Sequence, residues 1–91
     1  MSCMFYAAES FNQPIGNWDV SNVTNMSHMF FSTENFNQNI SNWNTIKVNT
    51  MSYMFAYSKK FNQDVSNWNI NNVTNMTGMF HQCPIKINYK L

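Results

Sequence analysis

The hydrophobic positions follow one pattern that returns every 25 residues along the chain. The stretch "FNQPIGNWDVSNVTNMSHMF" begins at Phe11, and "FNQDVSNWNINNVTNMTGMF" begins at Phe61. The recurring large apolar residues include Trp18, Trp43 and Trp68, Met26, Met51 and Met76, and Phe30, Phe55 and Phe80. A strict period in the twenties is typical of repeat proteins, in which each unit buries its apolar face only against its neighbours.

The period predicts a repeat solenoid, leucine-rich-repeat-like, with short stacked parallel strands, short helices and about 3.5 coils of 25 residues. A short strand is expected near residues 13–15 of the first unit. A short helix is expected where Met26, Met29 and Phe30 are spaced at i, i+3 and i+4. The predicted organisation is a repeat domain over 1–83, with units near 1–25, 26–50 and 51–75 and a partial unit at 76–83.

Equivalent residues of such an array stack into columns. The Trp column and the Met and Phe columns are expected to form the core, because burying a large apolar side chain contributes roughly 2–3 kcal/mol. The repeated asparagines Asn12, Asn37 and Asn62 are expected to form a buried ladder. An amide side chain both donates and accepts, so it can satisfy backbone groups that the turns leave unpaired.

The two ends of the chain differ from the repeat. At the C-terminus, "IKINYKL" alternates apolar and polar residues, which predicts a capping strand over 84–91 whose lysines discourage further pairing. At the N-terminus, Met1 already lies in phase with the repeat methionines. An uncapped apolar face is therefore expected there. It indicates either self-association through this face or a fragment of a longer repeat array.

Composition narrows the possible functions. Only 10% of the residues are charged and the formal net charge is +1, so binding to nucleic acid has no electrostatic basis. No apolar run is long enough to span a membrane. The first residues lack the basic and apolar regions of a signal peptide, so the sequence does not fix a location.

No arrangement of residues predicts catalysis. The chain offers no carboxylate pair, no nucleophile beside a base and no glycine-rich phosphate loop, so an enzyme is not expected. His28 and His81 are interpreted as surface residues. Cys3 and His28 share a repeat phase, but two ligands do not make a zinc site. No catalytic, cofactor-binding or metal-binding residue is therefore predicted, and no cofactor.

The residue pattern of the repeat resembles that of a known family. "NWDVSNVTNMSHMF" (17–30) and "NVTNMTGMF" (72–80) are similar to the repeat of BspA-like leucine-rich-repeat surface proteins, particularly the lipoprotein-associated version of mycoplasmas. The resemblance extends from Met1 to about Phe80. It implies a leucine-rich-repeat-like solenoid and a role at a cell surface, in adhesion or host contact. It implies no catalytic residues.

The repeat columns that vary are where a specific function is expected. Tyr6, Phe31, Tyr53 and Tyr57 fall in such columns, and aromatic residues are common anchors of protein contacts. Packing within the fold is an equal alternative for these residues. The leading hypothesis is a non-catalytic module that binds another protein or a surface glycan. The second is a structural component that self-assembles through its N-terminal face, and the third is a fragment without a separate role.

Overall fold

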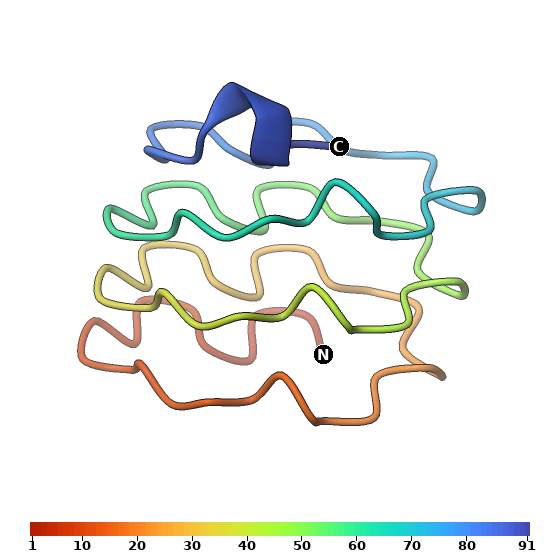
Figure 1. Ribbon diagram of the computed structural model, residues 1–91, viewed down its shortest axis with the longest axis horizontal. Coiled ribbons are helices and arrows are strands. Elements are labelled where there is room, and N and C mark those ends of the chain that lie inside the picture. Colours follow the sequence, from red (N-terminus) through yellow and green to blue (C-terminus); the bar gives the residue numbers. More distant parts are fainter.

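The chain winds through irregular layers rather than through strands and helices. The computed structural model describes residues 1–91, and its one named element is the 3-10 helix η1 (Ile87–Tyr89). Figure 1 shows the chain passing back and forth in stacked layers, with the N-terminal residues in the lower layers and η1 at the top. We call the layers the first (1–25), second (26–50), third (51–75) and fourth (76–91) windings.

The predicted fold class is wrong. The structure contains no strand and no sheet, only isolated parallel bridges from Asn25 to Thr50 and from Thr50 to Asn75. No helix forms around Met26, Met29 and Phe30, and the segment 84–91 is not a strand but contains η1. The leucine-rich-repeat-like solenoid of stacked parallel strands and short helices is therefore not seen.

Hydrogen bonding explains why the apolar i, i+3, i+4 spacing gives no helix. The N–H groups of His28, Phe30 and Ser32 donate to carbonyls of the third winding, at Ser52, Met54 and Ala56, over 2.8–2.9 Å. An α-helix would need these N–H groups for carbonyls four residues earlier in the same segment. The intervening N–H groups close tight turns instead, as in the bond from Phe31 to the His28 carbonyl.

The turns require an unusual backbone. Seven non-glycine residues have φ between 54° and 59°, and Gly78 has φ 63°. They occupy two columns of the repeat, which contain Cys3, His28, Tyr53 and Gly78, and Ala7, Ser32, Tyr57 and Gln82. A positive φ at the third residue of a turn is typical of type II turns. These columns sit in the left-handed region, which interrupts any helix.

The core consists of rings that stack from one winding to the next. Phe30 lies 5.5 Å from Phe5 and 5.4 Å from Phe55, and Phe55 lies 5.7 Å from Phe80, all with nearly parallel planes. A second column of phenylalanines runs beside this one, with Phe36 4.3 Å from Phe30. The two columns form a continuous aromatic core through the repeat, and stacked aromatic pairs add to the stabilisation by burial.

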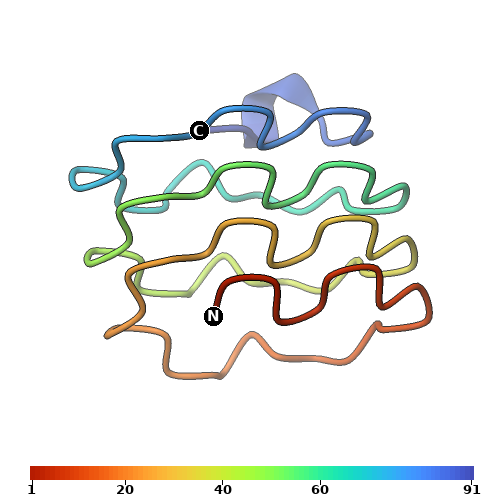
Figure 2. The same ribbon diagram turned by 180° about the vertical axis from the view of Figure 1, so that it is seen from behind.

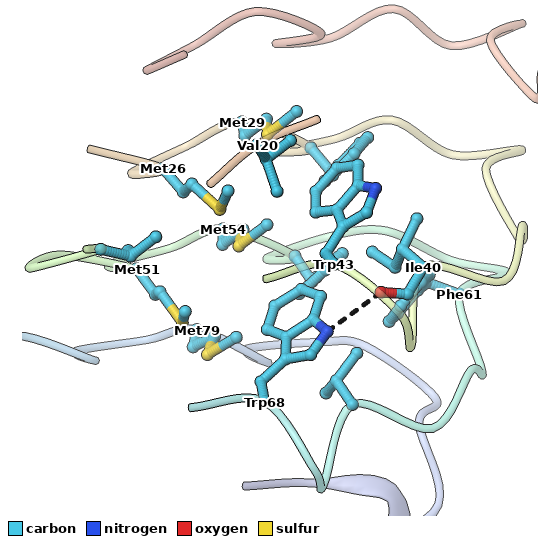
Figure 3. Close-up of a cluster of buried hydrophobic side chains, with 14 of the residues drawn as sticks. Val20, Met26, Met29, Ile40, Trp43, Met51, Met54, Phe61, Trp68 and Met79 are labelled. Atoms are coloured by element: carbon cyan, nitrogen blue, oxygen red, sulfur yellow. Dashed lines mark hydrogen bonds between the residues drawn. The ribbon is translucent and has the colours of Figure 1, made fainter. Parts of the chain in front are cut away.

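The tryptophans and methionines flank this core. The rings of Trp43 and Trp68 stack 6.0 Å apart at 10°. Trp68 donates its indole N–H to the backbone carbonyl of Ile40 over 3.0 Å, and Trp43 does the same to Ile15. Figure 3 shows the two indoles on one side of the close-up, with Met26, Met51 and Met79 on the other. Met26 and Met51 are fully buried, and Met76 is half-buried.

The asparagine ladder lies at the surface rather than inside the fold. Asn12 accepts the N–H of Asn37 through its side-chain oxygen over 2.9 Å, and Asn37 does the same for Asn62. Asn12 and Asn37 are exposed and Asn62 is half-buried. These amides therefore link successive windings, but they do not satisfy buried groups. Inside the fold that task falls to hydroxyls, such as Thr33 and Ser58, which donate to the carbonyls of Phe5 and Phe30.

Candidate functional site

One side of the molecule carries most of the backbone hydrogen bonds between windings. It comprises residues 1–8, 26–33, 51–58 and 76–83, and we call it the ladder side. Figure 2 views this side from the front, and η1 lies on the far side of the molecule. The left-handed residues all belong to the ladder side. Its tight turns bring side chains from different windings together at the surface.

The result is a group of six rings that we call the aromatic strip: Tyr6, His28, Phe31, Tyr53, Tyr57 and His81. Tyr6, Tyr53 and Tyr57 are 51%, 36% and 37% exposed. His81 is also exposed, and His28 and Phe31 are half-buried. The strip runs from the first winding to the fourth, so it is a surface feature of the whole repeat.

The rings of the strip hold one another in place. Tyr6 and Phe31 stack face to face, with centroids 4.9 Å apart and planes at 5°. Tyr57 meets Phe31 and His81 edge-on, at 5.4 Å and 5.3 Å. The ammonium group of Lys59 lies 5.4 Å from the centre of the Tyr57 ring. Each of these rings contacts at least one neighbouring ring, so the strip is pre-organised.

His28 and Tyr53 form the second part of the strip and depend on Gly78. The imidazole of His28 stacks on the Tyr53 ring at 5.1 Å. A Cβ at Gly78 would lie only 2.4 Å from a Tyr53 ring carbon, so a side chain there would displace the ring. Since Gly78 also has a positive φ, glycine fits this position for two independent reasons.

The sequence placed Tyr6, Phe31, Tyr53 and Tyr57 among candidate contact residues, whereas His28 and His81, which fall in the same variable columns, were interpreted only as surface residues. His28 shares its repeat phase with Tyr53, but its contacts with Tyr6 and Phe31 and the contact of His81 with Tyr57 join different phases. Turns with left-handed residues bring these phases together, and nothing in the apolar pattern indicates such turns. The single glycine of the column, Gly78, is the only signal that could have pointed to them.

Three titratable groups outside the strip have a shifted pKa. The hydroxyl and backbone N–H of Ser21 donate to the Asp19 carboxylate and lower its pKa. Ser66 lowers the pKa of Asp64 in the same way. Burial raises the pKa of the Cys83 thiol, which favours its protonated, less nucleophilic form. The two aspartates therefore stabilise turns, and Cys83 packs against the core.

A shallow depression of about 430 Å³ is lined by Lys59, Gln82, Cys83 and Pro84. It borders the strip at Lys59. Cys3 and Cys83 are both unpaired. No group of three or more histidine, cysteine or acidic residues is close enough to hold a metal ion. The functional groups available for binding at this surface are therefore the aromatic rings, the imidazoles and the nearby ammonium group of Lys59.

A family model described as "Mycoplasma protein of unknown function, DUF285" matches residues 1–90. The chain belongs to the DUF285 family. The match reaches every winding of this DUF285 chain and includes η1. The searches of curated proteins and of solved structures returned no match. No helix of this DUF285 chain has the length and apolar character needed to cross a membrane.

Proposed function

We propose that the chain is a non-catalytic binding module that presents the aromatic strip to another protein. The observation that carries this proposal is the row of connected, partly exposed rings from Tyr6 to His81. Tyrosine is enriched in protein contacts because it offers a large, rigid apolar surface together with a polar hydroxyl. A pre-organised strip loses little side-chain entropy on binding.

The backbone supports the same proposal. Left-handed φ costs an ordinary residue roughly 1–2 kcal/mol, and glycine avoids this cost. The chain nevertheless places His28, Tyr53 and Tyr57 at such positions, with φ of 56°, 54° and 59°. Strained conformations of this kind often mark binding surfaces. Here they display rings that a glycine could not provide.

The resemblance of 17–30 and 72–80 to BspA-like surface proteins supports a role in adhesion or host contact. A surface glycan is the second candidate partner, because tyrosines can pack against sugar rings. Such packing uses the open face of an aromatic ring. In the strip, one face of Tyr6 and one face of Phe31 lie against each other, so fewer ring faces are open to a sugar. This arrangement favours a protein partner over a glycan.

The test is a comparison of two variants in binding. The chain would be used to capture partners from extracts, and the captured protein would be purified and its affinity measured by calorimetry. We expect Tyr6→Ala combined with Tyr57→Ala to weaken binding at least tenfold, since aromatic anchors commonly contribute more than 1 kcal/mol each. Ile46→Ala, which removes a 44% exposed side chain outside the strip, should bind as the parent does.

Far-UV circular dichroism of each variant would show that the fold is retained. The proposal is wrong if the purified partner binds the strip variant as tightly as the parent, or if the Ile46 variant loses as much affinity. A glycan array probed with the same proteins addresses the second candidate. Binding there that depends on Tyr6 and Tyr57 would replace the protein partner with a sugar.

A further inference from the structure

The ladder side carries no charged side chain. Its four segments contain no aspartate, glutamate, lysine or arginine. They do contain all six rings of the aromatic strip, of which Tyr6, Tyr53, Tyr57 and His81 are exposed. The centres of protein interfaces are likewise depleted of charged residues and enriched in tyrosine. The ladder side therefore has the composition of the centre of a protein contact.

Charged residues lie instead along one rim of the ladder side. Glu9, Glu34 and Lys59 occupy equivalent positions of the first, second and third windings, and Lys60 follows. All four are exposed. They lie one above another, because the phenylalanine rings two residues after each equivalent position stack 5.7 and 5.9 Å apart. The rim is thus acidic on the first two windings and basic on the third.

The rim and the strip belong to one continuous surface. The ammonium group of Lys59 lies 5.4 Å from the centre of the Tyr57 ring, and Tyr57 meets Phe31 edge-on. Figure 2 shows the windings of this side one above another, with η1 behind them. The chain measures 29 by 24 Å in this view. A stable contact covers roughly 800 Å² of each partner, so it would use the strip and the rim together.

We propose that a protein which meets the strip is a second copy of this chain, with its windings stacked in the opposite direction. This inference rests on the proposed function, because the same strip forms the contact. A two-fold axis between the second and third windings places the acidic half of each rim opposite the basic half of the other. Glu34 of one copy then faces Lys59 and Lys60 of the second copy, and symmetry repeats this contact.

The order of charges selects this arrangement among the ways in which two copies can meet. A two-fold axis through the second winding would bring the two Glu34 carboxylates together. An axis through the third winding would bring the two Lys59 ammonium groups together. An axis parallel to the stack would hold the two rims at opposite edges of the contact, too far apart for their charges to pair. Unfavourable contacts between like charges exclude the wrong registers, and opposite charges favour the right one.

The rings provide the attraction in this contact, and the rim provides its orientation. Tyr53 and Tyr57 are 36% and 37% exposed, and a second copy on the ladder side would cover them. Burial of apolar surface is the main driving force for association, whereas charges at the edge of a contact mainly set its register. Both copies use the same surface, so the contact is complete at the dimer.

Sedimentation velocity over a range of protein concentrations, at low and high salt, tests the proposal. We expect the 91-residue parent to form a dimer and no larger species, and the dimer to weaken as salt is raised. Glu34→Lys should raise the dissociation constant about tenfold or more, because it opposes Lys59 at two places in each dimer. Lys59→Glu should do the same by opposing Glu34. Lys47→Glu is the matched control, since it reverses an exposed charge outside the ladder side.

An equimolar mixture of the Glu34→Lys and Lys59→Glu chains tests the pairing directly. In a dimer that contains one chain of each kind, opposite charges meet again at both contacts. We therefore expect the mixture to associate nearly as tightly as the parent, although neither variant does so alone. Restored association would also show that both variants are folded, because a misfolded chain would not regain its partner.

The strip variant, Tyr6→Ala with Tyr57→Ala, separates this inference from the proposed function. We expect it to weaken the dimer as well as the binding of a captured partner. A parent that stays monomeric at every concentration would overturn the second copy as partner, and a strip variant that still loses the captured protein would leave the proposed function standing. A dimer that the strip variant does not weaken, or that mixing does not restore, would also overturn the inference. No effect of the strip variant in either assay would overturn both.

Discussion

The first and second windings have closely similar sequences but very different environments. Phe36 of the second winding is fully buried between windings, whereas Phe11 of the first is only half-buried. The same contrast separates Met29 from Met4, and Trp43 from Trp18. The difference shows that a repeat unit does not carry its own core. Each unit supplies half of an interface, and its stability depends on the neighbours at both of its faces.

The largest effect on stability is expected when a phenylalanine of the stacked core is shortened to alanine. Phe36→Ala should lower the free energy of unfolding by about 3–5 kcal/mol, because a fully buried ring leaves a cavity between three phenylalanine neighbours. Phe11→Ala should lower it by about half as much, since part of that ring already contacts water. Urea unfolding at low concentration measures both. Equal losses would show that the first winding is as well covered as the second.

A smaller effect, in the opposite direction, is expected at the left-handed residues. Ala7→Gly and Ser32→Gly should each raise the free energy of unfolding by about 0.5 kcal/mol, since relief of left-handed strain exceeds the added entropy of the unfolded chain. The two φ angles are 55° and 54°, so the gains should match although the windings differ. The same urea experiment gives the comparison. A gain in only one winding would mean that packing, rather than φ, sets the cost.

The smallest effect is expected at the two exposed aspartate turns. Serine contacts lower the pKa of both Asp19 and Asp64 in the folded chain. A lowered folded-state pKa adds stability above the unfolded-state pKa, and this stability disappears as the pH falls through the folded-state pKa. The double variant Asp19→Asn with Asp64→Asn should lose less stability on acidification than the parent.

Thermal unfolding from neutral to acidic pH measures this dependence. Asp19 and Asp64 should contribute equally to the pH dependence of stability. Both carboxylates lie at the surface, and each is bound only by the serine two residues later. Asn39 makes the same contact to Ser41, so the amide preserves the turn. An unchanged pH dependence in the double variant would assign the acid sensitivity to other groups.

The sequence was least informative about the local backbone. The spacing of Met26, Met29 and Phe30 predicted a helix. In the structure, this segment forms turns in which His28 and Ser32 have a left-handed backbone conformation. Period analysis detects which residues share a face, but it does not distinguish a helix from a repeated turn. The alternation at 85–91 likewise predicted a strand, where the chain forms η1. In both places, bonds outside the segment determine its conformation.

The candidate site was partly accessible from the sequence. Variable columns pointed to Tyr6, Phe31, Tyr53 and Tyr57, because a scaffold position needs the same residue in every unit and a contact position does not. His28 stacks on Tyr53 of its own repeat phase, whereas the contacts of His28 with Phe31 and of His81 with Tyr57 join different phases and depend on the turn geometry.

The amino-acid sequence by itself determined which residues face one another across windings, because a fixed 25-residue period allows Phe30 to meet Phe55 and Trp43 to meet Trp68. Only the tertiary structure decided the left-handed backbone turns and the contacts between rings of different repeat phases. The physical reason is that these properties depend on hydrogen bonds and burial supplied by residues about 25 positions away, which outweigh the local preference of each segment.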